Sequence, residues 1–114
     1  MNYIDGFVSA VETEKKEVYK KHVEKIAPVF KKHGAVDFIE CWGEDVPEGE
    51  ITSFPKAVQL QPNETVVLSW IAWPSKEVRD AGMQNAMDEL KDVIHDMPFD
   101  GKRLIFAGFD VLYK

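Results

Sequence analysis

The stretch that most constrains the fold of this chain is Glu64–Asp80, which reads ETVVLSWIAWPSKEVRD. Its first ten residues are mostly apolar and rich in β-branched and aromatic side chains, which predicts a strand. Pro74 ends that strand, and Ser75 is placed to cap a following helix. Because side chains alternate along a strand, apolar residues occupy both of its faces. Such a strand is predicted to lie in the centre of a sheet that is covered on both sides.

The other patterned segments complete a β-α-β-β-α-β order. Strands are predicted over residues 2–11, 35–42, 64–73 and 103–113, and helices over 13–33 and 76–94. This order predicts the ferredoxin-like α+β fold, a four-stranded antiparallel sheet with two helices on one face. A length of 114 residues is typical of one domain, so we expect a single domain that spans residues 1–114.

Two helices cover one face of such a sheet, which leaves the other face in need of a partner. On the first strand, the smaller side chains are predicted to pack against the helices: Ile4, Gly6, Val8 and Ala10. The opposite face would then be an exposed apolar patch mixed with Asp and Ser. Pairing two such sheets face to face removes that patch and closes a barrel. We therefore predict a homodimer formed through the sheet face, a dimeric α+β barrel.

Composition excludes several classes of partner. Apolar residues make up 45% of the chain and charged residues 30%, as in soluble globular domains. The formal net charge of −6 argues against nucleic-acid binding, and no apolar run is long enough to span a membrane. Cys41 is the single cysteine, so no internal disulfide forms and a reducing compartment is favoured. The N-terminus lacks a signal-peptide pattern, and we expect a cytoplasmic protein.

Residues 43–63 form an unusually long connection, which carries Pro47, Pro55 and Pro62. Ser53 is placed to cap a short helix, whose anchors are predicted to be Phe54 and Val58. Long loops in small domains are commonly functional, so we expect this connection to cover a cavity mouth or to reach the partner subunit.

The sequence contains no strong catalytic, phosphate-binding or metal-binding motif. His22, His33 and His95 are scattered along the helices and near their ends, so we expect no metal site and no cofactor. Cys41 has no base beside it in the sequence, which favours a structural cysteine over a nucleophile.

Four polar residues interrupt otherwise apolar strands: Asp5, Glu40, Ser69 and Asp110. A buried carboxylate must be paired with a cation, or its pKa rises. A carboxyl group with a raised pKa can act as a general base, which makes Asp5 and Glu40 the candidate catalytic residues. A structural alternative stays open, in which either acid pairs with a cation: Arg79, Lys102 or Arg103.

Six short blocks occur in a familiar order: Tyr3–Phe7, Glu40–Trp42, Asp45–Pro47, Ser69–Ile71, Pro74–Asp80 and Met97–Arg103. Together they resemble the YbaA-like family, small bacterial proteins of unknown function among the dimeric α+β barrels. The resemblance runs nearly from end to end, and it implies the fold and a homodimer. It implies no activity, because the wider class of barrels includes monooxygenases, isomerases, haem-degrading enzymes and ligand sensors.

We expect a small aromatic or carbonyl-bearing molecule to bind in a cavity between the sheet and the helices. Catalysis there would be cofactor-independent proton abstraction, or oxygenase or isomerase chemistry, with Asp5 or Glu40 as the base. Four further residues are predicted to bind the ligand: Ser69, Trp70, Trp42 and Arg103. The alternative function is a non-catalytic ligand sensor or a structural interaction dimer.

Overall fold

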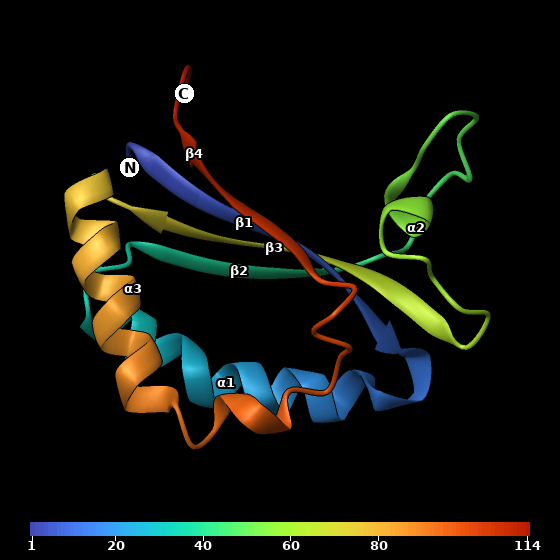
Figure 1. Cartoon of the computed structure of the whole chain (residues 1–114), viewed down its shortest axis with the longest axis horizontal. Coiled ribbons are helices and arrows are strands. Elements are labelled where there is room, and N and C mark those ends of the chain that lie inside the picture. The colour runs from blue at the N-terminus through green and yellow to red at the C-terminus, as the bar shows by residue number, and fades with distance from the viewer.

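The computed structural model describes the backbone of all 114 residues and every side chain except that of His95. Its sheet contains β1 (Tyr3–Glu12), β2 (Asp37–Trp42), β3 (Glu64–Trp73) and β4 (Ile105–Asp110). These strands lie in the order β2-β3-β1-β4, and neighbours are antiparallel. The helices α1 (Lys16–Lys32) and α3 (Lys76–Leu90) lie on the same side of the sheet (Figure 1). This arrangement confirms the predicted ferredoxin-like fold.

Local signals fix where most helices begin and end. The Ser75 hydroxyl accepts a hydrogen bond from the backbone of Val78 and caps α3, as predicted. Ser53 caps the short helix α2 (Phe54–Ala57) in the same way. Thr13 does not cap α1, because its hydroxyl bonds to Thr65 and residues Thr13–Lys15 form a 3-10 turn. Among the helices that the structure describes, none has both the length and the hydropathy to cross a membrane.

Residues 91–104, which we call the strap, differ most from the predicted elements. The helix α3 ends at Leu90, and a separate 3-10 turn follows at Ile94–Asp96. The last strand covers Ile105–Asp110, which is shorter than predicted at both ends. Four apolar side chains of the strap line the cavity beneath the sheet: Ile94, Met97, Phe99 and Leu104. Figure 1 shows the strap passing in front of α1 before it enters β4.

The sheet presents its polar residues, not its smallest ones, to the helices. Asp5, Ser9 and Ser69 are buried on the side that faces α1 and α3. The prediction that the small side chains of β1 pack against the helices is therefore wrong. Ala10, for example, packs on the opposite side against Val66 of β3. Both faces of β1 contain enough apolar residues for either orientation, and the helices stand off the sheet far enough to leave a cavity.

The long connection lies on the side of the sheet away from α1 and α3 (Figure 1). Val58 is fully buried against Ala10 and Val66, so it anchors the connection as predicted. Phe54 is half-exposed and does not serve as an anchor within this chain. None of the connection's residues, all of which the structure describes, lines the cavity. The connection therefore does not cover the cavity mouth, and the alternative that it reaches the partner subunit stays a prediction.

Candidate functional site

A cavity of about 630 Å³ lies between the helix-facing side of the sheet and the elements α1, α3 and the strap. Most of the side chains that line it are apolar: Phe7, Ile26, Phe30, Phe38, Met83, Met87, Ile94, Met97, Phe99, Leu104 and Phe106. The polar lining residues are Asp5, Ser9, Tyr19, Glu40, Ser69 and Arg79. An apolar cavity of this size with a few convergent polar groups is the usual form of a small-molecule site.

Strand register places one candidate acid in a row with aromatic residues. Glu40 of β2 is opposite Ser69 of β3, and Ser69 is in turn opposite Phe7 of β1. Phe7 is opposite Phe106 of β4, and the centres of their stacked rings are 6.4 Å apart. The row therefore runs from a carboxylate, past a hydroxyl, to an aromatic pair on one face of the sheet.

The other candidate acid lies in the adjacent row. Phe38 of β2 is opposite Ile71 of β3, which is opposite Asp5 of β1. Because β3 lies between β2 and β1, Asp5 and Glu40 occupy the same face without being neighbours across strands. Asp110, the fourth polar interruption, is exposed on the edge strand β4.

The Glu40 carboxylate is held by hydroxyl groups rather than by a cation. The Tyr19 hydroxyl donates to Glu40 Oε1 at 2.6 Å, and the Ser69 hydroxyl donates to the same oxygen. Among the described side chains, no lysine, arginine or histidine forms an ion pair with Glu40, and none donates to Oε2. Burial raises the pKa of Glu40, and the two hydroxyl donors offset only part of that rise. Burial also raises the pKa of Tyr19, so this phenol remains a proton donor.

The Asp5 carboxylate, in contrast, is fully paired. Asp5 is 3% exposed, and its Oδ2 accepts a hydrogen bond from Trp73 Nε1 at 2.9 Å. Arg79 donates to Asp5 Oδ1 from Nη2 at 2.7 Å, and its Nε lies 3.1 Å from both carboxylate oxygens. The hydrogen bonds to Asp5 raise the pKa of Arg79 further, so its guanidinium stays charged. The structure thus places Asp5 in the ion pair that the structural alternative anticipated.

The structure describes all four residues that were predicted to bind the ligand. Ser69 is the one among these four that lines the cavity. Trp70 follows Ser69 in β3 and therefore points to the other face of the sheet. Trp42 is on the helix-facing side but packs near Val67, with the Lys16 ammonium 5.5 Å from its ring centre. Arg103 lies at the end of the strap, outside the cavity lining.

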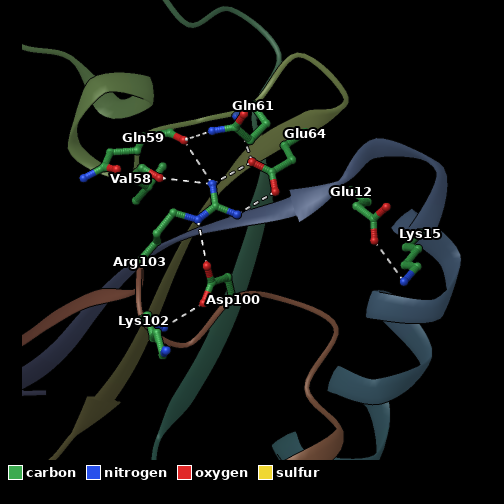
Figure 2. Close-up of polar contacts among 9 residues, drawn as sticks. All are labelled: Glu12, Lys15, Val58, Gln59, Gln61, Glu64, Asp100, Lys102 and Arg103. Atoms are coloured by element: carbon green, nitrogen blue, oxygen red, sulfur yellow. Dashed lines mark hydrogen bonds and ion pairs between the residues drawn. The ribbon is translucent and has the colours of Figure 1, made fainter.

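Arg103 ties the strap to the start of β3, as Figure 2 shows. Its Nη1 and Nη2 donate to the two carboxylate oxygens of Glu64 at 2.8 and 2.7 Å. Its Nε donates to Asp100 at 3.0 Å, and Nη1 also donates to the carbonyl of Gln59 at 3.0 Å. These contacts fix the end of the strap against β3 and the long connection. Other residues of the strap line the cavity, whereas Arg103 itself does not.

Sequence reasoning missed several lining residues, although one pattern in the sequence could have identified them. Arg79, Met83 and Met87 follow one another at intervals of four residues in α3, so they share one face of that helix. All three line the cavity. Tyr19 also lines the cavity, and nothing in the local sequence indicates that its hydroxyl contacts Glu40.

The described histidines do not converge on a metal site. His22 contacts the sulfur of Met97, and His33 Nε2 lies 2.9 Å from Glu89. The side chain of His95 lies outside the described residues. Among the side chains that the structure does describe, no group of three His, Cys, Asp or Glu residues could hold a metal ion.

Comparison with solved structures shows proteins of the same fold at low sequence identity. A dimeric ferredoxin-like protein from an uncultured marine organism has a TM-score of 0.64 at 10% identity, and the match covers 100% of this chain and 97% of that one. A protein from Nitrosomonas europaea, provisionally described as an antibiotic biosynthesis monooxygenase, has a TM-score of 0.53 at 14% identity, with 97% and 99% of the chains covered. These likenesses support the fold and carry no assignment of activity.

Comparison of sequences gives the family. The uncharacterized protein YbaA of Escherichia coli K12 is 51% identical over 112 residues, covering 96% of each chain. The protein of the same name from Shigella flexneri has the same identity and coverage. Residues 2–101 also match the model of a family described as protein of unknown function, DUF1428. The chain therefore belongs to the DUF1428 family, which agrees with the YbaA-like resemblance of its sequence blocks.

Proposed function

We propose that the cavity binds a small organic molecule whose apolar body lies against the phenylalanine rings and whose polar group meets Glu40. The observation that carries this proposal is the Glu40 carboxylate, which lines an apolar cavity without a cationic partner among the described side chains. Glu40 is partly buried, and a charge without a cation there is costly for the folded state, so a bound ligand that donates a hydrogen bond to it would offset that cost.

The geometry around Glu40 suits a general base. Tyr19 and Ser69 fix Oε1, which leaves Oε2 for a ligand. A carboxylate whose pKa is raised by burial accepts a proton more readily than an exposed one. For an enolisable ketone, Glu40 would take the proton from the carbon beside the carbonyl, and the electrons of that C–H bond would form the enolate. Reprotonation of the carbon completes the exchange without a cofactor.

Asp5 is the weaker candidate for this role because Arg79 neutralises its charge and Trp73 binds one of its oxygens. We assign Asp5 to the stability of the cavity wall rather than to proton transfer. Ser69 is a positioning residue in this proposal, since it fixes Oε1 of Glu40 from the centre of the row.

Binding is tested with 1-naphthol, a flat molecule that carries one hydroxyl donor. We expect saturable binding of one molecule per chain by isothermal titration calorimetry. Ser69→Leu places a larger side chain in the cavity and should abolish binding. The control is Thr65→Leu, which lies on the same strand and face but outside the cavity lining. Absence of saturable binding, or equal binding by both variants, would overturn the proposal.

The choice between an enzyme and a ligand sensor rests on proton exchange. With 2-tetralone in heavy water, an active base should exchange the protons next to the carbonyl, as followed by NMR. Glu40→Gln should stop this exchange while binding persists, because the amide is close in shape to the carboxyl group but is not a base. Binding of 2-tetralone without accelerated exchange in the unmodified protein would favour the non-catalytic sensor.

We also propose that two chains pair through the outer face of the sheet, where apolar side chains are exposed: Leu68, Ile105 and Phe109. Solved proteins of the same fold described as dimeric ferredoxin-like proteins support the formation of a dimer. Light scattering should give twice the chain mass of 13.0 kDa. Leu68→Glu should yield monomers, whereas Val18→Glu on the exposed side of α1 should not. A monomeric unmodified chain at micromolar concentration would contradict the proposal.

A further inference from the structure

We propose that the ligand of the cavity is a small organic cation, a protonated primary or secondary amine on an aromatic-sized apolar body. This inference rests on the binding part of the proposed function, since it names the charge class of the molecule that meets Glu40. It favours the non-catalytic sensor over the base, because an ammonium group would occupy the Oε2 that a base must keep free. It follows from the distribution of charge in the cavity, the position of the aromatic rings and the free oxygen of the carboxylate.

The charges that line the cavity do not balance. Asp5 and Arg79 form a close ion pair, with Arg79 Nη2 2.7 Å from Asp5 Oδ1. Arg79 Nη1 also lies 2.9 Å from Asp80, so a second carboxylate already occupies the outer side of this guanidinium. Glu40 is thus the lining charge that no described cation compensates. An anionic ligand would add a like charge, whereas an ammonium ion would neutralise the site.

The hydrogen bonds of Glu40 leave room for an N–H donor. Tyr19 and Ser69 both donate to Oε1, and no described side chain donates to Oε2. A neutral alcohol could donate one ordinary hydrogen bond to that oxygen. An ammonium group would donate a charge-assisted hydrogen bond, which is shorter and stronger. The carboxylate therefore discriminates between the two ligands by charge as well as by geometry.

Aromatic rings line the same cavity as the Glu40 carboxylate. Phe38 precedes Glu40 by two residues on the same face of β2, and its ring centre lies 5.4 Å from that of Phe30. Across the row, Phe7 and Phe106 form the second pair of rings. The face of an aromatic ring carries negative electrostatic potential and attracts cations. The methionine side chains in the wall are flexible and pack favourably against an aromatic body.

The charge of the whole chain favours the same class of ligand. The formal net charge is −6, so the field around the protein attracts cations and repels anions during diffusional encounter. This effect is screened by salt, whereas the contact with Glu40 inside the cavity is screened much less. The selectivity expected from Glu40 should therefore persist at high ionic strength.

Three probes of the same shape and different charge test the inference: 1-naphthylmethylamine, 1-naphthalenemethanol and 1-naphthoate. At neutral pH and high salt, calorimetry should show the amine binding roughly tenfold more tightly than the alcohol, because its hydrogen bond to Glu40 is charge-assisted. The carboxylate should bind most weakly. In Glu40→Gln the amine and the alcohol should bind with about equal affinity. Glu24→Gln, an exposed change of equal charge on α1, should keep the preference of the unmodified protein.

The outcomes separate this inference from the proposed function. If the alcohol binds as tightly as the amine, or the carboxylate binds tightest, the charge class is overturned while ligand binding in the cavity stands. If none of the three probes and no 1-naphthol binds, the proposed function itself is overturned. The comparison of the three probes in the unmodified protein needs no variant, so it decides the charge class even if Glu40→Gln fails to fold.

Discussion

Asp5 and Glu40 are two acids on one face of one sheet, and they line the same cavity. Asp5 faces the guanidinium of Arg79, whereas Glu40 faces two neutral hydroxyl groups. The difference lies in the helix residue that contacts each acid. Arg79 of α3 is a cation and binds Asp5, whereas Tyr19 of α1 is a phenol and binds Glu40. Since β3 supplies one hydrogen bond to each acid, the comparison teaches that the residue contributed by the packed helix distinguishes the two acids.

This difference has energetic consequences in opposite directions. Removing one member of a buried ion pair leaves an uncompensated charge, which is strongly destabilising. Removing a buried charge that has no partner relieves a cost. Substitutions at the two acids should therefore change the free energy of unfolding with opposite signs, and the predictions below follow in decreasing order of expected effect.

The largest effect is expected for Arg79→Met. Asp5 would keep its hydrogen bond from Trp73 but lose its cation while buried, so the free energy of unfolding should fall by about 3–5 kcal/mol. Urea denaturation measures this change. Lys76→Met is the control, because its ion pair with Asp80 is exposed and its loss should have little effect.

A second substitution sharpens the same result. Adding Asp5→Asn to Arg79→Met removes the carboxylate charge that has lost its cation, so part of the lost stability should be recovered. A double-mutant cycle measures this recovery as a coupling energy between the two residues. A loss no larger for Arg79→Met than for Lys76→Met would show that the pair carries no structural role, and Asp5 would return as a candidate base.

The sequence predicts the fold well because each element has its own signal. Strands 2–11 and 64–73 are long and apolar, and Ser75 marks the start of α3. The sheet faces were harder, since both faces of β1 and β3 carry apolar residues and alternation does not show which face the helices cover. Only the helix positions reveal that Asp5 and Ser69 face inward.

The candidate site was predicted in part for an equally physical reason. Acids that interrupt apolar strands are conspicuous, so both Asp5 and Glu40 were identified. Which arginine would meet an acid depends on tertiary packing, and the sequence offered Arg79 and Arg103 on equal terms. Trp70 directly follows Ser69, and adjacent residues of a strand point to opposite faces, so alternation alone argues against a shared cavity for these two predicted ligand-binding residues.

A smaller effect is expected for Tyr19→Phe. Loss of the hydroxyl removes one hydrogen bond from Glu40 and should lower the free energy of unfolding by about 0.5–1.5 kcal/mol. The pKa of Glu40 should rise further, because this hydrogen bond favours the ionised carboxylate. An NMR titration of the Glu40 carboxyl carbon measures that shift. Tyr113→Phe at the exposed C-terminal end is the matched control. An unchanged Glu40 pKa would contradict the contact between Tyr19 and Glu40.

Glu40→Gln should keep the fold and, near neutral pH, stabilise it by about 0.5–1 kcal/mol, since it removes an uncompensated charge from the cavity. Urea denaturation at pH 7 provides the measurement. Glu24→Gln on the exposed side of α1 controls for the change in net charge and should have almost no effect. A marked loss of stability in Glu40→Gln would mean that the carboxylate is paired in a way that the described contacts do not include.

The finest test of the comparison is the pH dependence of that gain. The pKa of Glu40 in the folded state is raised above its ordinary value of 4.5. At a pH between the ordinary pKa and the raised pKa, the folded chain holds a proton that the unfolded chain has lost. The contribution of Glu40 to stability therefore falls as pH rises through this window and is constant above it. Glu40→Gln lacks this group, so its advantage over the unmodified protein should be absent below the ordinary value and should grow toward neutral pH. Urea denaturation of both proteins from about pH 4 to about pH 8 measures the difference between their free energies of unfolding. The titration of all other groups contributes equally to both proteins and therefore cancels in that difference. A difference that shrinks as pH rises would show that the folded state favours the ionised form of Glu40, and Glu40 would then resemble Asp5 rather than contrast with it.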